Sequence, residues 1–157
     1  LLKMLEDRKI PSEGVIIDAK RPTTIKTRVI AHSQQVVRFD REKKDRVGPA
    51  TAGKVMDYIK KSAKGVDVIV ISDYAKGLIT ETLAQETAEI CRRLGKPVAV
   101  DPKVEHFDYY KGVTIVTPNN QEASLASGVE ITDDASLHRA GEILLNRLEC
   151  AALLITR

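Results

Sequence analysis

The sequence has 157 residues, 43% of them hydrophobic, so it is long enough for one modest domain with a buried core. Lys and Arg total 25 against 22 Asp and Glu, and a net charge of +3 is too small to indicate a nucleic-acid-binding protein. No apolar run approaches the roughly 20 residues of a membrane span and no signal-peptide pattern opens the chain, so we expect a soluble protein without membrane partners. The two cysteines, Cys91 and Cys150, lack metal-ligand spacing and are expected to be reduced, as in a cytoplasmic protein.

Both ends of the sequence read as the interior of a larger fold. The chain opens on the helical pattern of residues 1–5 and stops in a buried-strand pattern at residues 153–157. Because domains seldom begin and end inside core elements, we expect an internal piece of a longer protein.

The first part of the chain predicts a small antiparallel sheet, with the segment 13–42 as its bounds. Short β-branched runs alternate with turn residues there, at 15–17, 23–30 and 34–40. Alternation places Thr24, Lys26 and Arg28 on one face and the apolar Ile25 and Val29 on the other, which we expect to pack.

From residue 46 to 157, strands and helices alternate. A continuous apolar run at 68–71 is typical of a parallel strand covered on both faces. Thr82 and Gln85 have the spacing of a capping box at the start of a helix. Further strands are expected at 98–100, 113–116 and 151–156, and helices at 50–64, 82–94 and around 137–148. This order predicts an α/β fold with a doubly wound, mainly parallel sheet.

Open parallel sheets bind ligands beyond the carboxyl ends of their strands, so the residues that leave each strand are the candidates for a site. Polar groups follow several of these strands, in the segments 72–77, 101–103, 117–122 and 156–157. Asn119 and Glu122 could hold Mg²⁺ through its water shell, or they could simply cap the helix that they begin. Lys76 and Lys103 could neutralise phosphate oxygens, or they could be ordinary solvated lysines.

The polar face of the antiparallel segment offers a second candidate site. Lys26 and Arg28, with Arg38 on the next run, could clamp a phosphorylated sugar, because a guanidinium forms paired hydrogen bonds with phosphate. A solvated strand face is the alternative. The three histidines, including His106, show no catalytic spacing and are expected to be structural or exposed.

Five strings of residues occur in order over nearly the whole chain. They are Arg21-Pro22-Thr23-Thr24-x-Lys26-x-Arg28-Val29, Gln34-Gln35-x-x-Arg38-x-Asp40, Ser72-Asp73-Tyr74-Ala75-Lys76-Gly77, Asp101-Pro102-Lys103 and Thr117-Pro118-Asn119-x-x-Glu122. Their order and spacing resemble the heptose-7-phosphate kinase branch of the ribokinase/PfkB family. The last two strings are widespread in that family, whereas the first and third are more particular to the heptose branch.

The resemblance implies ATP- and Mg²⁺-dependent phosphorylation of D-glycero-D-manno-heptose 7-phosphate at its anomeric hydroxyl, a step toward ADP-heptose and the lipopolysaccharide core. It implies a ribokinase-like fold with a β lid, through which two subunits would pair as a homodimer. It also implies roles by position. Substrate binding would fall to Lys26, Arg28, Arg38, Asp73 and Lys76, phosphate binding to Lys103 and Asn119, and magnesium binding to Glu122 and Asn119.

The sequence also departs from the family pattern. The Gly-Ala-Gly-Asp motif that carries the family's catalytic base does not occur in it, so no catalytic residue is assigned and the 157 residues alone are expected to be inactive. Two other interpretations stay open at this point. One is a kinase of the same family for a different sugar or sugar phosphate, and the other is a non-catalytic dimerisation or binding module.

Overall fold

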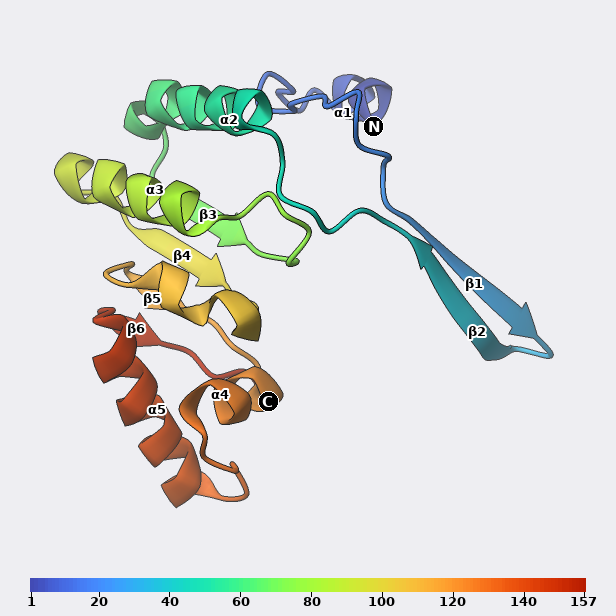
Figure 1. Ribbon diagram of the computed structural model, residues 1–157. Helices are drawn as coiled ribbons and strands as arrows, with labels where there is room; N and C mark the ends of the chain where they lie inside the picture. The colour runs from blue at the N-terminus through green and yellow to red at the C-terminus, as the bar shows by residue number, and fades with distance from the viewer.

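The computed structural model describes residues 1–157 and contains two sheets, one parallel and one antiparallel. Strands β3 to β6 form the parallel sheet in sequential order, while β1 and β2 form a hairpin that extends away from the body (Figure 1). The strands are β1 (Ile25–Ala31), β2 (Gln34–Arg41), β3 (Ile69–Ser72), β4 (Val98–Asp101), β5 (Ile115–Val116) and β6 (Ala152–Leu153). The helices are α1 (Leu2–Asp7), α2 (Pro49–Ser62), α3 (Glu81–Leu94), α4 (Asn120–Ser127) and α5 (Asp134–Leu148), with short 3-10 helices η1 (Ala63–Gly65) and η2 (Val104–Tyr110). The predicted α/β class with a small antiparallel sheet is confirmed.

The core lies on one face of the parallel sheet. Ile71, Val100 and Val116 point to this face in register and are buried, together with residues of α3, η2 and α5. On the opposite face Val70 is 64% exposed. The expectation that the run 68–71 is covered on both sides is therefore wrong for this chain, since the helices pack against only one face of β3.

Helix α3 begins earlier than its sequence pattern predicted. Thr80 is the N-cap, and its hydroxyl accepts a hydrogen bond of 3.2 Å from the backbone N–H of Leu83. The predicted capping box of Thr82 and Gln85 is wrong, because the Gln85 side chain instead donates to the carbonyl of Tyr109 at 2.8 Å. This bond ties α3 to η2.

The antiparallel segment contains two strands rather than three runs of strand, since residues 15–17 pair with nothing. Its apolar face does not pack within the chain, contrary to expectation. The side chains of that face that remain exposed are Ile25, Val29, Val37 and Phe39. We call the hairpin Ile25–Arg41 the lid.

None of the helices is both long and apolar enough to cross a membrane.

We expect Leu144→Ala to lower the free energy of unfolding by about 2–5 kcal/mol, because it leaves a cavity in the main core. Leu144 is 0% exposed and lies on α5 against the sheet. The matched control is Leu125→Ala, since Leu125 is 64% exposed and its loss should cost less than about 1 kcal/mol. Denaturant unfolding followed by circular dichroism measures both, and equal losses would contradict the packing described above.

Candidate functional site

The carboxyl ends of the parallel strands meet at one edge of the sheet. Main-chain hydrogen bonds join residues at these ends of the strands. The N–H of Asp73 donates to the carbonyl of Asp101 at 3.0 Å, and the N–H of Asn120 donates to the carbonyl of Thr156 at 2.9 Å. The polar segments that leave these strands are therefore neighbours in space, as the parallel order requires.

Asp73, directly after β3, is a buried carboxylate that is 1% exposed. Its Oδ2 accepts a hydrogen bond of 2.5 Å from the Tyr110 hydroxyl and lies 2.6 Å from Nδ1 of His106. Its Oδ1 accepts the N–H of Ala75 at 2.7 Å. Burial and the bond to Asp73 raise the pKa of Tyr110 well above its usual range, so the phenol remains a donor. Both carboxylate oxygens are thus engaged in holding the turn that follows the strand.

Sequence analysis missed His106 and Tyr110 as partners of Asp73, because they lie 33 and 37 residues away along the chain. The available signal was their position. Both belong to η2, which follows the Asp-Pro-Lys segment directly. His106 is half-buried, consistent with the structural role that the sequence suggested for it.

A second polar group joins the exits of β4 and β5. Lys103 Nζ lies 2.5 Å from Oε1 of Glu122, and Oε2 of Glu122 accepts the N–H of Asn119 at 3.0 Å. The Asn119 side chain accepts in return from the N–H of Glu122 at 2.9 Å, which makes the pair a capping box. The hydrogen bond that Lys103 donates to Glu122 raises the pKa of Lys103 and keeps it charged.

The two polar groups are connected to each other. The ring of His106 contacts Asp73, and the backbone N–H of His106 donates to the carbonyl of Lys103 at 2.9 Å. A continuous set of contacts therefore runs from Asp73 through η2 and Lys103 to Glu122.

A cavity of about 350 Å³ lies between the lid and the exit of β3. Lys26 from the lid and Lys76 from the turn after β3 both line it, and each has a carboxylate partner. Lys26 pairs with Asp40 at 3.1 Å, and Lys76 pairs with Glu42 at 2.6 Å. These bonds lower the pKa of both carboxyls. The remaining residues of its wall are Thr24, Ser72, Asp73, Tyr74, Leu78 and Ile79.

Arg28 and Arg38 do not line this cavity. They lie opposite each other on the lid and are both exposed. On the same face they form the next pair toward the tip after Lys26 and Asp40. Arg38 also contacts Asp40 at 3.2 Å, whereas Arg28 has no polar partner. Like charges directly opposite on a hairpin repel each other, so this pair favours an anion between or above the two guanidinium groups.

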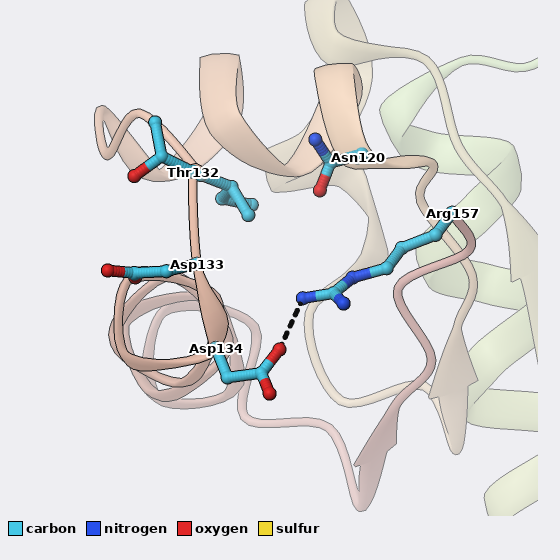
Figure 2. A pocket seen from close by; sticks show the side chains of 6 residues that line it. Asn120, Thr132, Asp133, Asp134 and Arg157 are labelled. Carbon is cyan, nitrogen blue, oxygen red and sulfur yellow. Dashed lines mark hydrogen bonds and ion pairs between the residues drawn. The ribbon is translucent and has the colours of Figure 1, made fainter.

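A larger cavity of about 580 Å³ lies beside the N-termini of α4 and α5 (Figure 2). Arg157 extends across it and pairs with Asp134 at 2.8 Å. The cavity does not include the lysines described above, but Asn120, the neighbour of Asn119, forms part of its wall. The side-chain oxygen of Asn120 is buried without a hydrogen-bond partner.

The donor set at this edge suits a hydrated hard cation rather than a tightly held one. No cluster of three or more His, Cys, Asp or Glu side chains is placed to enclose a metal ion. Glu122 and the amide oxygen of Asn119 lie together in the capping box, and the next residue, Asn120, has a side-chain oxygen without a hydrogen-bond partner. Mg²⁺ keeps most of its waters in such surroundings and takes further oxygens from phosphates, so these residues fit it.

The chain resembles known sequences over its whole length. The model of the pfkB family carbohydrate kinases matches residues 1–157. The bifunctional protein HldE of Geobacter sulfurreducens is 44% identical over 157 residues, which are 100% of this chain and 32% of that protein. The bifunctional protein HldE of Geotalea uraniireducens is 47% identical over 144 residues, covering 92% of this chain and 29% of that protein. The chain thus spans about a third of the length of these relatives.

Solved structures share the fold at low sequence identity. Phosphofructokinase-2 from Escherichia coli in complex with potassium aligns with a TM-score of 0.72 and 18% identity, over 96% of this chain and 48% of that one. The same enzyme in complex with fructose-6-phosphate aligns with a TM-score of 0.70 and 17% identity, over 99% of this chain and 51% of that one. These structures show the shared fold, and the match of the family model to residues 1–157 places the chain in the pfkB family of carbohydrate kinases.

Proposed function

We propose that the protein containing this chain is an ATP-dependent sugar kinase that phosphorylates D-glycero-D-manno-heptose 7-phosphate at its anomeric hydroxyl. The observation that carries the proposal is the cavity under the lid, where Lys26 and Lys76 face the exit of β3. Family membership supports a sugar substrate and ATP. The heptose assignment rests on the two strings that resemble the heptose branch, and the product would serve ADP-heptose and lipopolysaccharide core synthesis.

The sugar phosphate would lie in the cavity, with its phosphate toward the cations. Lys26 and Lys76 would exchange part of their contact with Asp40 and Glu42 for phosphate oxygens. Arg28 and Arg38 would reach the same phosphate only if the lid bends toward the body, because neither lines the cavity. Asp73 would act on the substrate mainly through the turn that it holds, since its oxygens are already engaged.

The nucleotide phosphates would lie at the exits of β4 and β5. Lys103 would neutralise phosphate charge, and Glu122 and Asn119 would hold Mg²⁺ through its water shell. When bound, Mg²⁺ supplies charge neutralisation to the phosphates. Lys103 is already fixed by Glu122, so it needs little reorganisation to meet the developing charge of the transferred group.

The proposal is tested with a substrate panel. The polypeptide, extended to the length of its relatives, is assayed with ATP, Mg²⁺ and a set of heptose and fructose phosphates. A preference for heptose 7-phosphate supports the assignment, and a preference for a fructose phosphate shows a different kinase of the same family. No turnover of any sugar, with no calorimetric heat on adding ATP and Mg²⁺, would instead fit a binding module.

We expect Lys76→Met to raise the KM for the sugar phosphate about 10- to 100-fold, because a hydrogen bond to a charged group is lost. The KM for ATP should stay within about threefold, since Lys76 lies at the exit of β3 and not at those of β4 and β5. Lys54→Met is the control, because Lys54 is exposed on α2 without an ion-pair partner. Equal effects of the two substitutions in steady-state kinetics would contradict the placement of the sugar phosphate.

We expect Lys103→Met to lower kcat by about 10²- to 10³-fold, the usual effect of removing one preorganised group that stabilises transition-state charge. Glu122→Gln should raise the Mg²⁺ concentration needed for half-maximal rate. Lys111→Met serves as the control, since Lys111 makes only a surface pair with Glu149 at 3.8 Å. A kcat for Lys103→Met within twofold of the control would refute the assignment of Lys103.

We also propose that two copies pair through the apolar face of the lid, which is exposed in the single chain. Phe39→Ser should weaken the homodimer at least tenfold, because Phe39 is 58% exposed and would lose its burial against the partner. Sedimentation velocity over a dilution series measures the effect. Leu125→Ser, which changes an exposed leucine on α4, should leave the sedimentation coefficient unchanged, and dissociation by both variants would argue against a lid interface.

A further inference from the structure

Two linkers join the lid to the body, and Arg21 lies where they cross the turn after β3. Its guanidinium donates hydrogen bonds to main-chain carbonyls only. Nη1 contacts the oxygen of Asp45 at 2.6 Å, and Nη2 contacts those of Lys43 at 2.8 Å and Lys76 at 2.7 Å. Asp45 and Lys43 belong to the linker that returns from the lid, whereas Lys76 belongs to the wall of the proposed sugar cavity. One side chain therefore bonds both linkers of the lid to the cavity.

The same crossing is closely packed around Gly77. The N–H of Val47 donates to the carbonyl of Gly77 at 2.8 Å. Gly77 has φ of +79°, and a Cβ there would lie 1.9 Å from the carbonyl oxygen of Asp45, so only glycine allows this approach. Lys76 Nζ adds a contact of 2.6 Å to Glu42, which directly follows the lid.

Nothing else bonds the lid to the body. No hydrogen bond or ion pair connects residues 25–41 with the remainder of the chain, and Figure 1 shows the hairpin extending freely from its base. The direction in which the lid extends is thus set where its linkers meet the turn after β3. Lys26 lies on the lid and Lys76 lies in this turn, and both line one cavity, so their separation depends on the same contacts.

We propose that Arg21 is a positioning residue, which fixes the lid over the cavity and so determines the affinity for the sugar phosphate. This inference rests on the proposed function. A guanidinium suits the task because its fixed fork can reach several carbonyls at once, whereas a lysine at the same position can offer only a point charge. Arg21 has no carboxylate partner, so its charge serves the carbonyls alone.

The test is Arg21→Lys in the polypeptide extended to the length of its relatives, with Arg139→Lys as the matched control. Arg139 lies on α5, is exposed and makes no side-chain bond. We expect Arg21→Lys to raise the KM for heptose 7-phosphate about 10- to 100-fold, the effect of losing bonds from a charged donor. The KM for ATP and kcat should stay within about threefold, and Arg139→Lys should match the unmodified protein. Unchanged KM for the sugar phosphate, or an equal rise in both KM values, would overturn the proposal.

Hydrogen exchange provides a readout that does not need activity. The amide of Val47 and the peptides spanning 42–48 and 73–77 should exchange about tenfold faster in Arg21→Lys than in Arg139→Lys. If no sugar phosphate is turned over by the unmodified protein, the proposed function fails and exchange alone decides the role of Arg21. Faster exchange then supports it, and unchanged exchange overturns it.

A second variant covers the case in which Arg21→Lys does not fold. Glu42→Gln removes the ion pairs of Glu42 with Lys76 and Lys44 and keeps all three bonds of Arg21. Like Arg21→Lys, it should raise the KM for the sugar phosphate, but by less than tenfold. A KM for Glu42→Gln equal to that of Arg139→Lys would contradict the claim that the lid junction controls binding.

Discussion

The arrangement of the site depends on one buried carboxylate. Asp73 is 1% exposed at the end of β3, and an unpaired charge there would be strongly unfavourable. Tyr110 and His106 prevent this, and both come from η2. The chain must therefore turn into η2 immediately after β4, which fixes Lys103 beside the exit of β5. From there Lys103 reaches Glu122, so burial of one carboxylate at β3 determines where a cation lies two strands away.

The charges of the site are arranged so that each inward-facing lysine has a carboxylate partner before any ligand arrives. Lys26 has Asp40, Lys76 has Glu42 and Lys103 has Glu122. The lysine of each pair is partly exposed to solvent, and ion pairs that solvent reaches contribute little to stability, roughly 0–1 kcal/mol each. Their main effect is positional. A lysine that is already held by one acceptor loses less conformational freedom when it binds a phosphate. The neighbouring carboxylates also disfavour weakly charged anions, which cannot compete with the carboxylates for the lysines.

Sequence alone predicted the α/β order and the parallel strands well, because continuous apolar runs such as 98–100 report burial directly. It failed where partners lie far apart in the chain. Residues 15–17 have the composition of a strand but no neighbour to pair with. Thr82 and Gln85 have the spacing of a capping box, but the helix already begins at Glu81 with Thr80 as its N-cap. His106 and Tyr110 were missed for the same reason, since their link to Asp73 exists only after β3 and β4 pair.

The lid shows how the two proposed functions of this region depend on each other. An isolated two-stranded hairpin is only marginally stable in water, and this one is bonded to the body only at its base. Its two faces differ in chemistry. Lys26 and the two arginines share one face, and four exposed apolar side chains share the other. A second copy that covers the apolar face would restrict the hairpin's motion and leave the cations free. The entropy cost of ordering the hairpin when the sugar phosphate binds would then be smaller. Pairing of subunits and binding of the sugar would then favour each other, because both depend on the same hairpin being held in place.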